Sequence, residues 1–207
     1  RLERSRVAAS NVEKLSVWVG EKYKSVLPNV SDVCQYLRSE NQVQVTHYLT
    51  IQHGDLHGDN LHVIGDQPFV IDFGRTGVGP RYTDATQFIA DVMARGSKWS
   101  ISKDSAGFDK FVRECAGVCQ AVCAEDQTLL PEGEAVGPVQ IANMVINVWL
   151  REVHRAGNNP FGGVGFIHLE FLDMFVQNSI FLFGRSKFEP SEEMLVRYLL
   201  LRQCLMM

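Results

Sequence analysis

Residues 53–74 constrain the chain more than any other segment, because they place several polar side chains at fixed spacings. His53, Asp55 and Asn60 follow the pattern H-x-D-x-x-x-x-N, and an Asp-Phe-Gly triplet begins at Asp72. Phosphoryl transfer needs a group that orients the attacking hydroxyl and accepts its proton, and it needs oxygen ligands for magnesium. The carboxylate of Asp55 suits the first task. The amide oxygen of Asn60 and the carboxylate of Asp72 suit the second, so the segment favours a phosphoryl-transfer site.

Two short apolar runs, 61–64 and 69–71, lie inside this segment and predict a small β-hairpin. The four residues between them are Gly-Asp-Gln-Pro, which are typical turn residues. Asn60 immediately precedes the first run, and Asp72 immediately follows the second. The hairpin is therefore expected to bring these two side chains to neighbouring strand ends, where one metal ion could reach both.

The rest of the chain is expected to be mainly helical. Extended structure is predicted for 43–51, and a Gly-rich loop for 74–80. The first predicted helix, 2–27, has Val12, Leu15, Val19 and Val26 on one side, and the second, 31–39, is capped by Ser31 or Asp32. Further helices are predicted at 84–94, 108–124, 139–155, 166–183 and 191–205.

Segment 53–74 resembles the catalytic and metal loops of the aminoglycoside phosphotransferase and choline kinase group, which are relatives of protein kinases. In that group His-Gly-Asp replaces the His-Arg-Asp of protein kinases. The resemblance implies that Asp55 is the catalytic base and that Asn60 and Asp72 bind Mg²⁺ and, through it, ATP. It also implies that His53 braces the loop. Asp84 would receive backbone N–H groups of the catalytic loop, although a helix N-cap also explains this residue.

The stretch 71–79, with Asp84 shortly after it, looks more specifically like phosphotransferase-like domains of bacterial signalling and conflict systems. Some of those are described as ternary complex associated domains. His57 and Arg75 flank the same loops and are candidate contacts for substrate or phosphate. Arg75 is equally well explained as a solvated surface residue.

The fold class that follows from the resemblance is α+β. It is the C-terminal lobe of a protein-kinase-like fold, mainly helical, with a β-hairpin that carries the two loops. We expect one domain, 1–207, with lead-in helices at 1–50, the catalytic and metal loops at 51–83, and a helical subdomain at 84–207. No Gly-rich loop or strand lysine occurs before His53. The N-terminal lobe is therefore expected to be absent, upstream or a separate chain, which would leave ATP binding by this chain weak.

Two alternatives remain open at this stage. A catalytically degenerate kinase-like domain could retain the motif and act as an interaction module. Gly54-Asp-Leu-His-Gly58 also resembles the opening motif of calcineurin-like metallophosphoesterases. That fold needs two further motifs, but Gly65-Asp66 is not followed by a second Asp at the required place, and Asn158 is followed by Asn159 rather than His.

Composition excludes several other classes. The net charge is −4 and no long basic run occurs, so neither nucleic acid nor a membrane surface is an expected partner. No stretch qualifies as a membrane span. The five cysteines are odd in number and follow no secretory segment, which favours free thiols and a cytoplasmic location. The expected partners are a nucleotide and a hydroxyl-bearing acceptor, with a small molecule favoured.

Overall fold

The computed structural model describes residues 2–39, 45–96 and 164–206, together with the single positions 113, 116, 117, 144 and 147. The predicted helices 108–124 and 139–155 lie outside the continuous described segments. The described part combines α-helices with small antiparallel sheets, as expected, and this mixture is compatible with a kinase-like fold.

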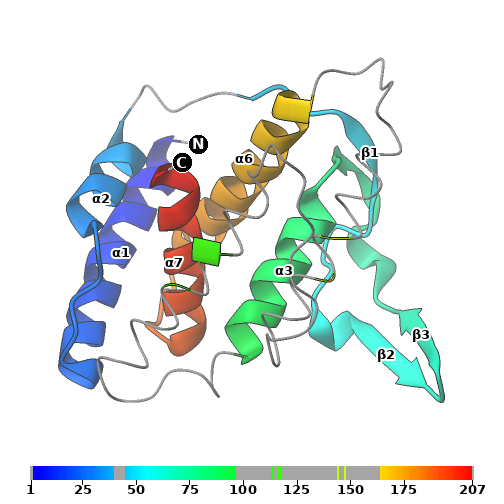
Figure 1. The fold of residues 1–207 in the computed structure, drawn as a ribbon, viewed down its shortest axis with the longest axis horizontal. Helices are drawn as coiled ribbons and strands as arrows, with labels where there is room; N and C mark the ends of the chain where they lie inside the picture. Colours follow the sequence, from blue (N-terminus) through cyan, green and yellow to red (C-terminus); the bar gives the residue numbers. More distant parts are fainter. Residues whose placement is uncertain are drawn as a thin grey trace.

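The described helices pack side by side, with one hairpin standing away from them (Figure 1). Helices α6 (Val164–Phe183) and α7 (Glu192–Met206) contact each other, and both contact α1 (Leu2–Tyr23) and α3 (Thr83–Gly96), so this pair forms the centre of the group. Helix α2 (Val30–Arg38) packs against α1 on the side far from the strands. Helix α3 lies between the other helices and the strands in Figure 1, and it contacts residues 58–60, which immediately precede β2 (Leu61–Ile64).

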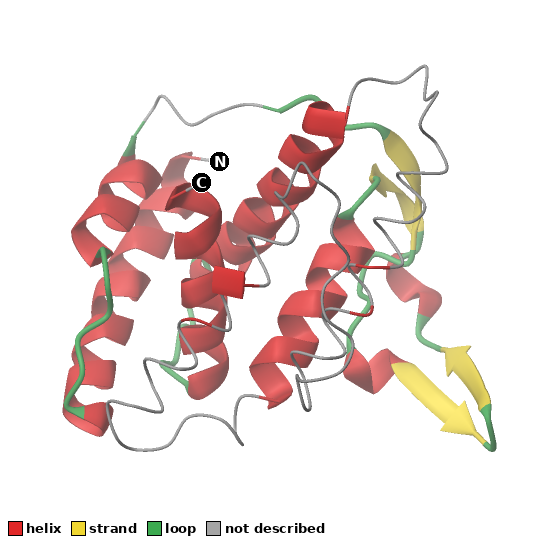
Figure 2. Cartoon of the chain, in the orientation of Figure 1, coloured by secondary structure: helices red, strands yellow, loops and turns green. Residues whose placement is uncertain are grey.

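Four short strands form two separate antiparallel pairs in the described part of the chain (Figure 2). Strand β2 (Leu61–Ile64) pairs with β3 (Gln67–Val70) in the register Leu61↔Val70, which confirms the predicted hairpin. Its turn has two residues rather than the four expected, since Gln67 and Pro68 belong to β3. The turn contains Gly65 at φ +60°, a left-handed conformation that glycine adopts readily.

The second strand pair corrects one prediction. Strand β1 (Leu49–Gln52) pairs with β4 (Gly77–Pro80), whereas these glycine-containing residues were expected to remain in a loop. Backbone groups alone form a strand ladder, so a Gly-rich stretch can pair when its partner is fixed nearby. The approach at Gly79 is close, because a Cβ atom there would lie 3.4 Å from Cγ of Gln52.

The first two helices have different ends from those predicted. Helix α1 stops at Tyr23, and Lys24 follows in a left-handed conformation with φ 51°. Val26, predicted to lie on the buried face, is therefore 80% exposed, and Leu27 is buried instead. Helix α2 begins after Asn29, which adopts φ 57° and has no side-chain capping bond, so the expected caps at Ser31 and Asp32 are wrong.

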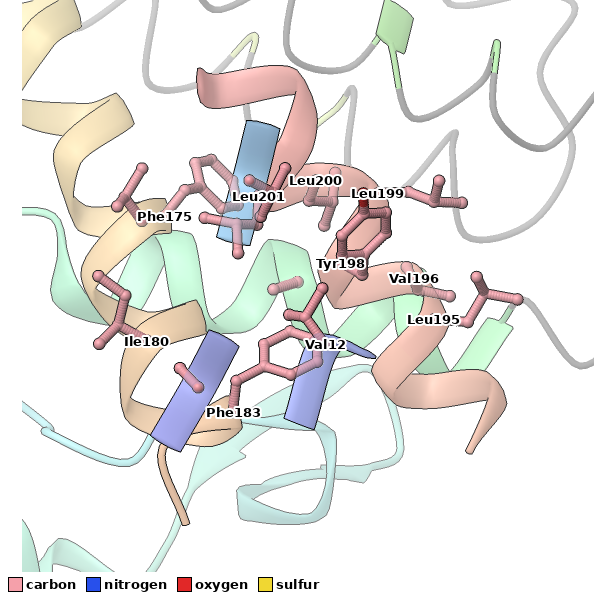
Figure 3. Packing of buried hydrophobic residues seen from close by; sticks show 14 of the residues in the cluster. Val12, Phe175, Ile180, Phe183, Leu195, Val196, Tyr198, Leu199, Leu200 and Leu201 are labelled. Carbon is pink, nitrogen blue, oxygen red and sulfur yellow. The ribbon is translucent and has the colours of Figure 1, made fainter. Parts of the chain in front are cut away.

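The hydrophobic core joins α1, α2, α3, α6 and α7, and Figure 3 shows part of it. Val12, Leu15 and Val19 of α1 are fully buried, as their helical spacing predicted. In α7 every residue from Leu195 to Leu201 is buried, which fits its central position. Full burial of one such side chain contributes roughly 1.5–3 kcal/mol. None of the helices in the described segments is long and apolar enough to cross a membrane.

Phe171 tests this core. Its ring centroid lies 5.3 Å from that of Tyr82 and 5.4 Å from that of Phe175, and the residue is fully buried. Phe171→Ala should lower the free energy of unfolding by about 3–5 kcal/mol in urea titrations, because it removes apolar contacts and leaves a cavity. Leu169→Ala, on the exposed side of the same helix, should cost well under 1 kcal/mol. Equal losses for both variants would contradict the packing.

Candidate active site

The predicted catalytic loop begins at His53, and its first residues are held by the carboxylate of Asp84 in α3. Strand β1 ends at Gln52, and the next two backbone N–H groups, of His53 and Gly54, donate to Asp84 at 2.7 and 2.9 Å. These bonds are charge-assisted and use both carboxylate oxygens. The Gln52 side chain in turn accepts from the Asp84 N–H at 3.3 Å. The direction in which the chain leaves β1 is therefore fixed by the first turn of α3.

Gly54 allows the catalytic loop to touch the metal loop. Its φ of +81° lies in the left-handed region. A Cβ atom at this position would stand 2.5 Å from the carbonyl oxygen of Arg75, which is closer than such atoms can approach. Any other residue would therefore strain the backbone and push the two loops apart.

His53 joins the same two loops by a side-chain contact. Its Nε2 lies 2.8 Å from the carbonyl oxygen of Ile71, so Nε2 carries the proton and donates. Its ring packs edge-on against Phe73, with centroids 5.0 Å apart. The Ile71 N–H also donates to the carbonyl of Asn60 at 3.0 Å. Residue 72 therefore starts immediately beside Asn60, at the open end of the hairpin.

Asp55 lines a pocket of about 450 Å³ between the catalytic loop and helices α3, α6 and α7. Gln87 donates to its Oδ1 at 3.0 Å, and the Arg75 guanidinium lies 3.3 Å from its Oδ2. The side chain of Arg75 is 65% exposed, so this ion pair faces solvent. One oxygen of the Asp55 carboxylate is thus held by the Gln87 amide. The other lies beside the guanidinium of Arg75, a long and exposed side chain.

Asn60 and Asp72 both offer a free oxygen. Asn60 is 6% exposed, and its Nδ2 donates to the Asp55 carbonyl at 2.9 Å, which leaves its Oδ1 without a hydrogen bond in the described part of the chain. Within the same residues, the Asp72 carboxylate forms no hydrogen bond or ion pair. Asp72 has φ 59°, a conformation uncommon outside glycine and often found at functional sites. Oxygen donors of this kind fit a hard cation such as Mg²⁺.

No cluster of three or more His, Cys, Asp or Glu side chains in the described segments could hold a metal ion by itself. His57 nevertheless lies beside Asn60. Its Nε2 is 3.4 Å from Nδ2 of Asn60, and its Nδ1 is 3.9 Å from Oδ2 of Asp59. Its Nδ1 is buried and has no hydrogen-bond partner among the described residues. The ring also lines the pocket that contains Asp55.

A second carboxylate of α3, which the sequence analysis missed, holds the far end of the catalytic loop. Asp91 accepts the Gly58 N–H at 2.8 Å and is only 3% exposed. Its Oδ2 lies 2.8 Å from Nε of Arg95, and its Oδ1 lies 3.6 Å from Nη2 of Arg197 in α7. Asp91 is seven residues after Asp84, two helical turns along the same face. The seven-residue spacing from Asp84 could have indicated that Asp91 lies on the same helix face, but nothing in the sequence identified the groups that Asp91 binds.

Arg95 extends this network to the loop surface. It binds both oxygens of Asp59 at 2.5 and 2.6 Å. The hydrogen bond from Arg95 lowers the pKa of Asp59, so this carboxylate is charged at neutral pH. Other pocket residues lie far along the chain, on α6, on α7 and in the connection between them, and no motif pointed to them: Asn178, Phe181, Leu182, Arg185, Glu193 and Arg197.

Comparison with known proteins supports the resemblance seen in the loops. The family described as "Phosphotransferase enzyme family" (APH) matches residues 22–112. This range contains the catalytic loop, the hairpin, the metal loop and all of α3. The expected likeness to the aminoglycoside phosphotransferase group is confirmed over this range, without support for the narrower ternary complex type. Neither the curated proteins nor the solved structures yield a match.

Asp91 provides a test of the loop anchoring. Asp91→Ala should lower the free energy of unfolding by about 1–3 kcal/mol, because it leaves the Gly58 N–H without its acceptor and removes one of the two carboxylates beside the buried Arg197, which keeps Glu193. Asp66→Ala, at the exposed tip of the hairpin, should change it by less than about 0.5 kcal/mol. Chemical denaturation of both variants measures this difference. A loss below about 1 kcal/mol for Asp91→Ala would refute the anchoring role.

Proposed function

We propose that the chain is the catalytic and metal-binding part of an ATP-dependent phosphotransferase that acts on a hydroxyl group, with a small-molecule acceptor favoured. One observation supports this most: Asp55 lines a pocket at the point where the catalytic and metal loops touch. The family match over residues 22–112 independently favours phosphotransferase chemistry. In this proposal the described helices belong to the C-terminal lobe of a kinase-like fold, and the protein works in the cytoplasm.

Asp55 would act on the acceptor. Gln87 fixes Oδ1, so Oδ2 would orient a hydroxyl and accept its proton once the exposed Arg75 guanidinium, now 3.3 Å away, turns aside. As the hydroxyl oxygen bonds to the γ-phosphorus, the bond from phosphorus to the ADP oxygen breaks, and the electron pair stays on ADP. Asp55 takes the proton that the hydroxyl gives up. Catalysis in this class depends mainly on such positioning, and that explains why the loop needs anchors at both ends.

Asn60 and Asp72 would hold Mg²⁺ through the two free oxygens described above. Mg²⁺ prefers six oxygen ligands, so phosphate oxygens and waters would complete its shell. When bound, the ion neutralises charge on the phosphates. His53 supports this pair indirectly, because its bond to the Ile71 carbonyl fixes the residue before Asp72.

Arg75 and His57 would meet the phosphate or the acceptor. The Arg75 guanidinium already lies 3.3 Å from the Asp55 carboxylate and is exposed, so it can turn towards an incoming phosphate oxygen. His57 lies between Asn60 and the pocket. Both side chains therefore flank the place where the transferred group must pass.

The test is the rate of ADP formation from Mg²⁺–ATP in the presence of acceptor, measured on the protein together with the N-terminal lobe that the sequence analysis expects upstream or on a separate chain. Asp55→Asn should lower this rate by about 10²–10⁴-fold, because the amide cannot accept the proton. Stability should change little, since Asn keeps the shape of the side chain. Asp66→Asn makes the same chemical change at the hairpin tip and should leave the rate unaltered.

Two other outcomes identify the alternatives. Hydrolysis of a phosphate monoester with Mn²⁺ and without nucleotide would indicate a metallophosphoesterase. Equal rates for wild type and Asp55→Asn would remove Asp55 from the chemistry and favour a degenerate domain that acts as an interaction module.

A further inference from the structure

The pocket beside Asp55 is rich in arginine, although the whole chain has a net charge of −4. Its lining contains four arginines and three acidic residues. The arginines are Arg75, Arg95, Arg185 and Arg197, and the acids are Asp55, Asp91 and Glu193. Which of these charges remain available decides what kind of ligand the pocket can recognise.

Each acidic residue of the pocket already has a cationic partner. Asp91 pairs with Arg95 at 2.8 Å, Glu193 with Arg197 at 2.9 Å, and Asp55 with Arg75 at 3.3 Å. A positively charged ligand would have to displace one of these guanidinium groups to reach a carboxylate.

Arg185 differs from the other arginines of the pocket. Among the described residues it forms no ion pair, and its guanidinium instead lies 5.5 Å from the ring centroid of Phe181. Its backbone position is fixed, because its carbonyl accepts from the buried Asn11 at 3.2 Å and its N–H donates to Leu182 at 3.4 Å. The backbone that carries this exposed side chain is thus fixed just after α6, and the guanidinium has no ion-pair partner among the described residues.

A second guanidinium, which is not among the residues that line the pocket, lies on the same ring. Arg4 of α1 lies 5.1 Å from the same Phe181 ring and also forms no ion pair within the described segments. Phe181 is half exposed and lines the pocket. Two guanidinium groups without ion pairs among the described residues therefore lie beside Phe181, one of them in the pocket lining, and their positive charges favour an anion there.

We infer that the acceptor carries an anionic group, a carboxylate or a phosphate monoester, in addition to its hydroxyl. Arg185 binds the anion, and Asp55 meets the hydroxyl. The inference rests on the proposed function, since it names the acceptor class of the same site. A planar guanidinium suits both anions, because it can donate two parallel hydrogen bonds. A polycationic acceptor such as an aminoglycoside does not fit this pocket.

Four probes of similar size test the inference by calorimetry or ligand-observed NMR, without nucleotide or metal. They are glycerol 3-phosphate, glycerate, neutral glycerol and cationic 2-amino-1,3-propanediol. The two anions should bind the 207-residue chain, and the neutral and cationic probes should not. Arg185→Gln should weaken anion binding about tenfold or more, and Arg185→Lys should restore part of it. Lys187→Gln removes a nearby exposed charge outside the pocket and should have no effect.

Three results would overturn the inference: no binding of either anion, binding of the cationic probe as strong as that of the anions, or equal anion binding by wild type and Arg185→Gln. The assay needs no phosphoryl transfer, so it is independent of the test of Asp55. Failed anion binding together with a slow Asp55→Asn variant would reject only the acceptor class. Anion binding that requires Arg185, without any ADP formation, would reject only the phosphotransferase proposal.

Discussion

The carboxylate of Asp84 is the contact on which the arrangement of the site depends. Two successive N–H groups, those of His53 and Gly54, converge on it and set the course of the chain as it leaves β1. Two turns later on the same helix, roughly 10 Å away along its axis, Asp91 holds Gly58. One face of α3 therefore holds both ends of the loop that carries Asp55.

Helix α3 connects the hydrophobic core to the site, because it packs into the core on one side and binds the loop that carries Asp55 through Asp84 and Asp91. Tyr82 immediately precedes this helix and packs on Phe171, while Ile89 and Met93 of the helix are fully buried. Arg197 of α7 reaches the buried Asp91 from the other side. The hairpin has no such support, since all its residues except the first are exposed. The core thus fixes the loop bearing Asp55, and hydrogen bonds between the loops then position Asp72.

Local patterns predicted the hairpin and the five α-helices of the described segments, apart from a few residues at their ends, because turn residues and apolar spacing act over a few residues. They also predicted that Asn60 and Asp72 flank the hairpin. They failed at β4, whose pairing depends on the distant strand β1. They also failed at the start of α2, where Asn29 precedes the helix in a left-handed conformation and forms no side-chain capping bond. Asp91 and the walls of the pocket were missed because their partners lie on helices far apart in the chain. Interactions of this kind leave no local pattern in one sequence.

The central claim is that Asn60 and Asp72 form a metal site that serves nucleotide binding next to Asp55. Calorimetric titration of ADP with and without Mg²⁺ tests it most directly, using wild type, Asp72→Asn and the hairpin-tip control Asp66→Asn. The account predicts that Mg²⁺ increases ADP affinity in wild type and in the control, and that this increase is largely lost in Asp72→Asn, because an amide is a much weaker ligand than a carboxylate. An equal Mg²⁺-dependent gain in all three proteins would contradict it.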